Sequence, residues 1–189
     1  MGKYDMKSSF KSIQFITWSA MIAAGYTALT IFAASLNLAS GSIQVRFSEA
    51  LTILPAFTPA AIPGLFIGCL ISNFVTGCLP WDIVFGSIAT LLGALGTWAL
   101  RKQHRLLSSV PPIVANTLIV PFVLRNVYQI PGSIPFFMLT VGAGEVISCG
   151  ILGQLFYSAL YPHRQAIFDS PIPENKGDTA EDGSDSVDI

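Results

Sequence analysis

Residues 81–100, WDIVFGSIATLLGALGTWAL, form an unbroken apolar stretch of 20 residues with Asp82 as its single charged side chain. An α-helix of about 20 residues crosses the roughly 30 Å apolar core of a bilayer. Basic residues follow directly, at Arg101, Lys102 and Arg105. A helix of this length and composition with a basic loop at one end is typical of an integral membrane protein.

The composition of the whole chain points the same way. Of its 189 residues 52% are hydrophobic and 11% are charged, whereas an ordinary soluble domain carries about 25% charged residues. Hydropathy predicts an all-α integral membrane protein with six transmembrane helices. The predicted spans are residues 13–36, 42–57, 60–77, 81–100, 110–124 and 134–160. Residues 1–12 form an N-terminal segment, residues 13–161 a single membrane domain, and residues 162–189 an acidic tail that is expected to be disordered.

The distribution of Lys and Arg predicts the orientation of these helices. Short loops rich in Lys and Arg remain in the cytoplasm. If the N-terminus is cytoplasmic, most basic residues lie on the cytoplasmic side: Lys3, Lys7, Lys11, Arg101, Lys102, Arg105 and Arg164. The opposite topology reverses this bias. We therefore expect a plasma-membrane protein with both termini in the cytoplasm.

In this orientation the polar side chains of the membrane domain gather at the outer ends of the helices. They are Asn37, Ser40, Gln44, Arg46, Glu49, Asn73, Thr76, Asp82, Arg125, Asn126, Tyr128 and Gln129. Glu145 lies deeper, about three turns into the last helix. Ionisable groups in a bilayer are costly and usually functional. The pattern predicts a pocket that opens to the outside and does not pass through the protein.

Three ionisable residues are the leading candidates for ligand contacts. Arg46 and Glu49 are three residues apart, so they share a helix face and either pair with each other or grip a ligand together. A carboxylate suits an N–H edge such as that of guanine, and it also suits an ammonium group. Glu145 follows two glycines that allow close approach of a planar solute. Its alternative role is a hydrogen bond to a neighbouring helix.

The other candidates carry two interpretations each. Asp82 is expected either to cap its helix or to bind ligand. Asn73 and Asn126 can both donate to and accept from a heterocycle. Tyr128 can stack on a flat ring or anchor the chain at the membrane interface, and Arg125 can pair with a carboxylate or touch the ligand.

Other sequence features limit the chemistry. Ala20, Ala24 and Ala28 give the first helix a small-residue face, either for packing within this protein or for a partner helix. The three cysteines show no metal-ligand or disulfide spacing. The chain has no phosphate-binding loop and no hydrolase motif, and its short inner basic loop gives no reason to expect nucleic-acid binding.

Several runs of sequence resemble a known family. Residues 43–55, IQVRFSEALTILP, and residues 57–69, FTPAAIPGLFIGC, closely resemble the QueT family of queuosine-precursor transporters. Residues 82–91, DIVFGSIATL, and residues 142–145, GAGE, are similar to it as well. The resemblance extends from the first helix to about Tyr161, and the acidic tail lies outside it.

The resemblance implies a substrate-binding S component of an energy-coupling-factor (ECF) transporter. Such proteins have six helices and both ends in the cytoplasm, and they pair with a transmembrane coupling subunit and two ATPases. ATP is then used by the partners, and this chain has no cofactor of its own. The family's alanine spacing in the first helix, which docks the coupling subunit, maps onto Ala20 and Ala24, with Ala28 one turn further.

The implied ligand is a 7-deazaguanine, in its 7-cyano or its 7-aminomethyl form. Two carboxylates, Glu49 and Glu145, favour the aminomethyl form. One carboxylate can accept hydrogen bonds from the ring N–H groups, and the other can pair with the ammonium. The implied mechanism is capture outside, followed by toppling of the subunit within the membrane and release inside.

Three alternatives remain open at the level of sequence. The ligand can be a different purine-like compound or vitamin of the same transporter class. The chain can be a small membrane enzyme with Glu145 and Asp82 as acid and base. It can also be a solute carrier that works without partners.

Overall fold

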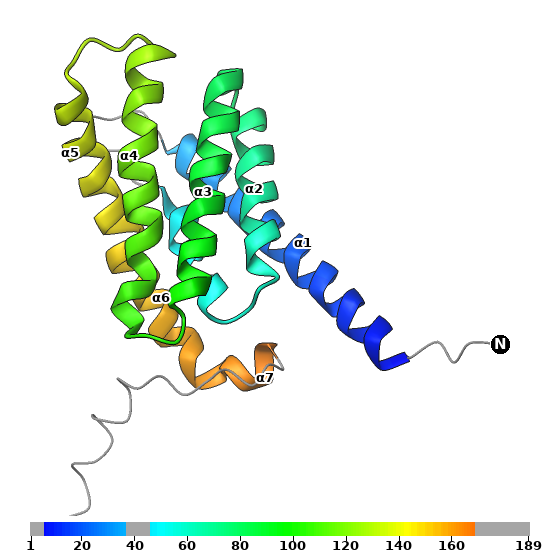
Figure 1. Cartoon of the computed structure of the whole chain (residues 1–189). Coiled ribbons are helices and arrows are strands. Elements are labelled where there is room, and N and C mark those ends of the chain that lie inside the picture. Colours follow the sequence, from blue (N-terminus) through cyan, green and yellow to red (C-terminus); the bar gives the residue numbers. More distant parts are fainter. Residues whose placement is uncertain (1–5, 37–45, 169–189) are drawn as a thin grey trace, which may run out of the picture.

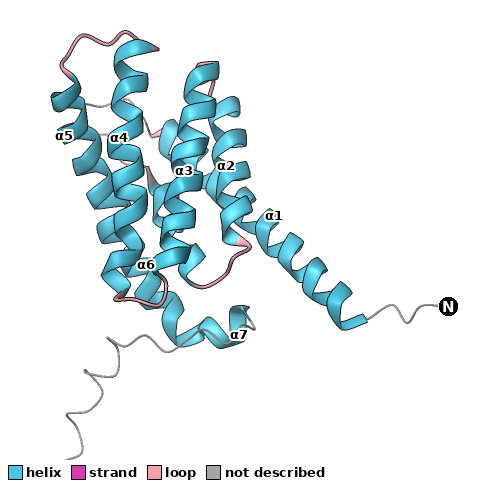
Figure 2. Cartoon of the chain, viewed as in Figure 1, coloured by secondary structure: helices cyan, strands magenta, loops and turns pink. Residues whose placement is uncertain are grey.

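The structure, a computed structural model, describes residues 6–36 and 46–168, which contain helices and no strand (Figures 1 and 2). The elements in chain order are α1 (Met6–Ser35), η1 (Phe47–Ala56), α2 (Ala61–Val75), α3 (Pro80–Leu100), η2 (Arg105–Ser109), α4 (Val110–Asn126), α5 (Ile134–Glu145), η3 (Val146–Leu152), α6 (Gly153–Leu160), η4 (Tyr161–His163) and α7 (Arg164–Phe168). The prediction of an all-helical fold is confirmed.

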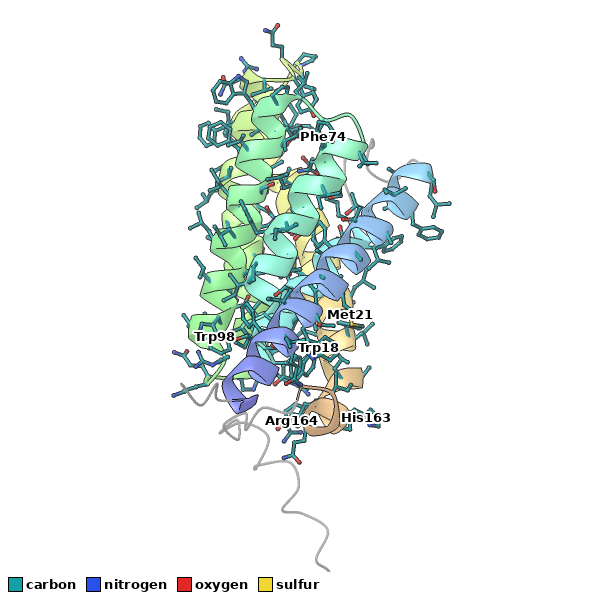
Figure 3. The ribbon with its side chains drawn as sticks, turned by 90° about the vertical axis from the view of Figure 1, so that its right-hand side faces the viewer. Trp18, Met21, Phe74, Trp98, His163 and Arg164 are labelled. Atoms are coloured by element: carbon teal, nitrogen blue, oxygen red, sulfur yellow. The ribbon has the colours of Figure 1, made fainter. Side chains whose placement is uncertain are left out.

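Four helical segments are long and apolar enough to cross a membrane. They are Ser12–Ser35, Pro80–Leu100, Arg105–Asn126 and Ile134–His163. They correspond to the first, fourth, fifth and sixth predicted spans. The third corresponds to α2, a shorter apolar helix of 15 residues. Large apolar side chains such as Phe74 and Leu139 are more than 70% exposed, as expected for surfaces that face lipid (Figure 3).

The second predicted span differs from the prediction. Its described part forms the ten-residue 3-10 helix η1, and residues 42–45 lie outside the described residues. A 3-10 helix rises about 2.0 Å per residue, so η1 is about 20 Å long and too short to cross the apolar core. Pro55 lies inside it. η1 packs against α1, α3, α6 and η3, and seven of its residues are buried.

The last span is continuous from α5 through η3 to α6, as predicted, but its middle is not α-helical. Residues Val146–Leu152 adopt a π-helix. Such segments are rare and frequently occur at functional sites. η3 begins directly after Glu145 and packs against η1, so a π-helix and a 3-10 helix lie against each other inside the bundle.

Helices α1 and α2 cross closely, while the N-terminal half of α1 extends away from the bundle (Figure 1). Ser19 Oγ donates to the Ala60 carbonyl at 2.9 Å, and Thr27 Oγ1 donates to the Gly68 carbonyl at 3.3 Å. Gly64 and Gly68 are the small residues at this crossing. The close approach of the two backbones depends on them.

Replacing Gly68 with alanine is expected to destabilise the protein by about 1–3 kcal/mol. The new Cβ would lie 2.9 Å from the Ala23 carbonyl oxygen and 2.9 Å from Tyr26 Cβ, so the helices must separate. Thermal unfolding in detergent measures the effect. Gly25→Ala is the matched control on α1, because its Cβ would meet nothing closer than Leu51 Cδ1 at 3.9 Å. Equal stability of the two variants would contradict this packing.

The described part of the predicted tail is helical. Phe168 on α7 is buried, and its ring stacks on Phe57 with centroids 5.8 Å apart and lies 5.1 Å from Trp18. The tail prediction for residues 169–189 lies outside the described residues. Likewise α1 begins at Met6, within the predicted N-terminal segment.

Candidate ligand-binding site

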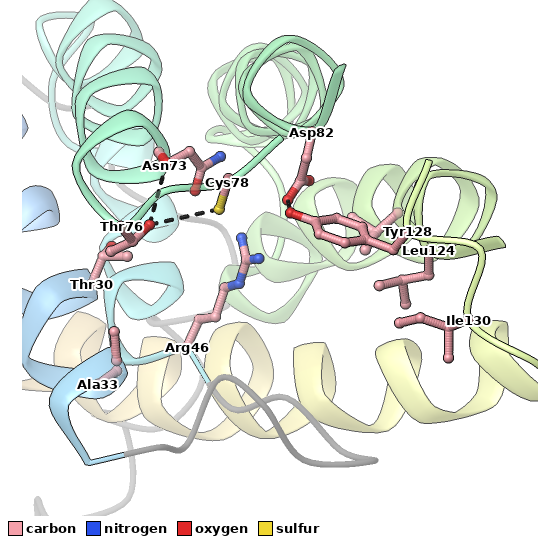
Figure 4. Close-up of a pocket in the computed structure, with 12 residues that line it drawn as sticks. Thr30, Ala33, Arg46, Asn73, Thr76, Cys78, Asp82, Leu124, Tyr128 and Ile130 are labelled. Carbon is pink, nitrogen blue, oxygen red and sulfur yellow. Dashed lines mark hydrogen bonds between the residues drawn. The ribbon is translucent and has the colours of Figure 1, made fainter. Parts of the chain in front are cut away.

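A cavity of about 340 Å³ lies where α2 ends and α3 begins, beside the end of α4 (Figure 4). Its volume is within the range of small-molecule sites. It is lined by Thr30, Ala33, Ala34, Arg46, Asn73, Thr76, Cys78, Asp82, Val120, Leu124, Tyr128 and Ile130. Asp82 is in the first turn of α3 and Arg101 follows its last turn. The cavity is therefore at the opposite end of the bundle from the basic loop.

Arg46 supplies a positive charge to this cavity. It is the N-cap residue of η1, and its backbone N–H donates to Ser148 Oγ on η3 at 3.2 Å. Its side chain points into the cavity (Figure 4). Within residues 6–36 and 46–168 no group forms a hydrogen bond or ion pair with the guanidinium. The planar fork of N–H donors of this guanidinium therefore suits a ligand in the cavity.

Asp82 and Tyr128 form the opposite wall. Tyr128 donates its hydroxyl to Asp82 Oδ2 at 2.8 Å and accepts the Leu79 backbone N–H at 3.3 Å. The N-cap of α3 is Leu79, and no side chain caps this helix. Capping therefore does not explain Asp82. Burial, together with the neighbouring Asp82, raises the pKa of Tyr128 above its ordinary value, so its hydroxyl remains a donor.

Asn73 presents an amide from the end of α2. It is 2% exposed and lines the cavity, and its Nδ2 lies 3.5 Å from Cys69 Sγ, a weak acceptor. A Cβ at Gly86 of α3 would lie 3.1 Å from Asn73 Nδ2. The absence of a side chain at Gly86 is what allows the amide to fit between α2 and α3.

The floor beneath the cavity is polar. On α1 Tyr26 is one turn below the lining residue Thr30, and on α4 Asn116 is one turn below Val120. Residues three apart on a 3-10 helix lie on the same face, so Glu49 lies beneath Arg46. Tyr26 donates to Glu49 Oε1 at 2.5 Å and Asn116 Nδ2 donates to Glu49 Oε2 at 3.5 Å. Glu49 is 1% exposed.

Glu145 completes the floor from α5. Cys149 Sγ donates to Glu145 Oε2 at 3.1 Å. Glu49, Glu145 and Cys149 offer atoms that lie within 4.8 Å of one another, a spacing that is also compatible with a metal ion. Two buried carboxylates this close repel each other, so the pair is stabilised by a cation or by a shared proton.

Comparison with known proteins identifies the family. The model of the QueT transporter family matches residues 16–162. The chain belongs to the QueT transporter family. The queuosine precursor transporter QueT of Lactococcus lactis subsp. cremoris (strain MG1363) is 36% identical to it over 74 residues, which is 39% of this chain and 43% of the relative. The aligned part thus spans less than half of that relative. No solved structure matches the chain.

All residues of the cavity and its floor lie within the part that matches the QueT family. Of the residues predicted from sequence, the cavity brings together Arg46, Asn73, Asp82 and Tyr128. Glu49 and Glu145 lie beneath it and are hydrogen-bonded to other residues of the chain. The predicted direct pair of Arg46 with Glu49 is not among the contacts of the described residues.

Arg125 and Asn126 do not line the cavity. Both are exposed at the end of α4. Arg125 donates to the backbone oxygen of Gly132, and Asn126 borders a shallow apolar groove with Trp81 and Phe85. Tyr26 and Asn116 are not among the site residues predicted from sequence. An amide in the middle of the apolar span 110–124 is the signal that would have found Asn116.

The exposed face of α1 carries the predicted partner residues. Ala20, Ala24 and Ala28 are exposed and repeat every four residues, so they form one stripe. The opposite face of the same helix carries Tyr26, which is 1% exposed and reaches the floor of the cavity.

Proposed function

We propose that this chain is the substrate-binding S component of an ECF-type importer and binds a queuosine precursor. Its cavity faces the outside of the plasma membrane, and both termini are in the cytoplasm. The observation that carries this proposal is the Arg46 guanidinium, which points into an outer cavity of a QueT-family membrane protein and has no hydrogen-bond partner among residues 6–36 and 46–168.

The cavity matches the polar edge of a 7-deazaguanine. The ring's carbonyl accepts a hydrogen bond, which suits the Arg46 guanidinium, and its adjacent N–H groups donate, which suits the Asp82 carboxylate. Asn73 can satisfy a remaining donor or acceptor. The apolar walls formed by Val120, Leu124 and Ile130 suit the ring faces.

Charge around the site favours the 7-aminomethyl form. Among the described residues, three buried carboxylates, those of Glu49, Asp82 and Glu145, lie in or beneath a cavity that is lined by one guanidinium, that of the half-buried Arg46. Buried charges need partners. The ammonium of the aminomethyl form supplies positive charge that the neutral 7-cyano form lacks.

The rest of the transport cycle is assigned to partners. The chain has no phosphate-binding loop, so ATP hydrolysis falls to two ATPase subunits. The stripe of Ala20, Ala24 and Ala28 is the proposed contact with the transmembrane coupling subunit, because small side chains allow close approach of a second helix. Toppling of the loaded subunit would bring the cavity to the cytoplasmic side.

Isothermal titration of the purified chain in detergent or nanodiscs tests the proposal. The ligands are 7-aminomethyl-7-deazaguanine, 7-cyano-7-deazaguanine, guanine and a panel of vitamins. Saturable binding of the aminomethyl form at one site, tighter than that of guanine or any vitamin, is the expected result. Tighter binding of a vitamin would assign the cavity to another ligand of this transporter class.

Tyr128→Phe is expected to weaken binding of the aminomethyl form by about 1 kcal/mol, or roughly fivefold. The phenylalanine cannot donate to Asp82, which then loses its orientation. Because the pKa of Tyr128 is raised, the hydroxyl remains protonated, and the difference between wild type and variant should stay constant from about pH 6 to pH 9. Titrations across this range measure it. Unchanged affinity would remove Tyr128 from the site.

A further inference from the structure

We propose that Asn116 is a specificity-determining residue that positions Glu49 and Glu145 to receive the ligand's ammonium group. This inference rests on the proposed function, because it assigns the part of the site that distinguishes the aminomethyl from the cyano form. Asn116 acts on the ligand through the two carboxylates.

The position of Asn116 supports this role. It is 4% exposed and lies on α4 one and two turns below Val120 and Leu124, which line the cavity. The face of α4 that borders the ligand therefore continues downward to this amide. Within the described part of α4 it is the amide nearest the floor of the cavity.

Asn116 contacts both carboxylates of the floor. Its Nδ2 donates to Glu49 Oε2 at 3.5 Å, and it also lies close enough to Glu145 to interact with that carboxylate. A side-chain amide carries two N–H donors on one nitrogen. The amide on α4 thus bonds to Glu49 of η1 beside Glu145 of α5, whose carboxyl oxygen lies within 4.8 Å of that of Glu49.

The uncharged amide is the feature that matters for specificity. A lysine or arginine at this position would neutralise the carboxylates, and an aliphatic residue would remove the amide donor and leave only Tyr26 and Cys149 to support them, which favours their protonated forms. The amide supports negative charge on the pair and does not cancel it. The pair therefore remains able to attract an ammonium group, which forms stronger hydrogen bonds with carboxylates than a neutral group does.

The role of Asn116 is tested by measuring the affinity of one variant for the aminomethyl and the cyano form of the ligand. Asn116→Leu is expected to weaken binding of 7-aminomethyl-7-deazaguanine at least about tenfold and binding of 7-cyano-7-deazaguanine less than about threefold. The ratio of the two dissociation constants is the decisive quantity. A merely structural role for Asn116 would weaken both ligands equally.

Two further variants complete the test. Asn116→Ser keeps one donor in a smaller side chain and should reduce the preference for the aminomethyl form even if the leucine variant does not fold. Thr117→Val is the matched control, because Thr117 Oγ1 is buried and has no hydrogen-bond partner among the described residues. It should leave the ratio unchanged.

The outcomes separate the two proposals. If the wild-type chain binds the aminomethyl form more tightly and the Asn116 variants lose that preference, the inference holds. If the variants keep the wild-type ratio, or lose affinity for both ligands equally, Asn116 does not determine specificity. If the folded wild-type chain binds neither deazaguanine, the proposed function itself fails.

Discussion

Replacing Arg46 with methionine is expected to weaken binding of 7-aminomethyl-7-deazaguanine by about 2–3 kcal/mol, or roughly 30- to 150-fold. The guanidinium is the cation that lines the cavity, and no described residue competes for it. Its loss also leaves the ligand's carbonyl without a donor in a largely apolar site. Methionine keeps the length and flexibility of the side chain, so the measured change reports the charge and its hydrogen bonds. Titration calorimetry measures the affinity.

Arg125→Met is the matched control for this prediction. Arg125 is the other arginine expected at the outer face, but it is exposed and donates to the Gly132 backbone outside the cavity. Its variant should bind ligand within about twofold of wild type, even if the loop that follows α4 becomes less stable. A large loss with Arg125→Met and none with Arg46→Met would place the ligand elsewhere.

Asp82→Asn is expected to have the second largest effect, a loss of about 1.5–3 kcal/mol in binding. Asparagine occupies the same volume and can still accept the Tyr128 hydroxyl, so the wall of the cavity is preserved. It removes a negative charge and presents N–H donors to the donor edge of the ligand. The N–H donors of the guanine-type edge then face the N–H donors of the asparagine amide, which lowers the affinity for the ligand.

Thr76→Val provides the comparison for Asp82. Thr76 also lines the cavity, but its hydroxyl already donates to the Ser72 carbonyl at 2.8 Å, so its removal costs the ligand little. Melting temperatures of all variants in detergent verify that they fold. Wild-type affinity in the Asp82→Asn protein would show that the ring does not donate hydrogen bonds to this carboxylate.

Apolar length alone predicted most of the fold. The spans at 13–36, 81–100 and 134–160 consist of apolar residues with few charges, and for such runs helix is the only plausible structure in a membrane. Hydropathy could not predict η1, because it registers the apolar composition of residues 42–57 but not the helix type. It also could not predict η3, since a π-helix differs from an α-helix in hydrogen-bond register and not in composition.

The site was predicted in part because its outer residues are polar groups at the ends of apolar spans. Arg46, Asn73, Asp82 and Tyr128 satisfy that criterion and line the cavity. Arg125 and Asn126 satisfy it equally well but lie on the far side of α4. The criterion gives the level of a residue along the membrane normal. The direction of its side chain depends on the rotation of each helix, which packing decides.

The hydrogen-bond partners of Glu49 also could not be predicted from the sequence. The position of Glu49 on a polar face predicted a ligand contact but not the two hydrogen bonds that Tyr26 and Asn116 donate to its oxygens beneath the cavity. Those donors come from α1 and α4, which lie 23 and 67 residues away in the chain. Only the folded structure brings them to the carboxylate.

The central claim is that the outer cavity binds a cationic 7-deazaguanine through Arg46 and the carboxylates around it. Titration of the purified wild-type chain and its Arg46→Met variant with 7-aminomethyl-7-deazaguanine tests this claim most directly. We expect saturable binding to one site per wild-type chain and a loss of at least about thirtyfold in the variant. Equal affinity of the two folded proteins, or no binding to either, would contradict it.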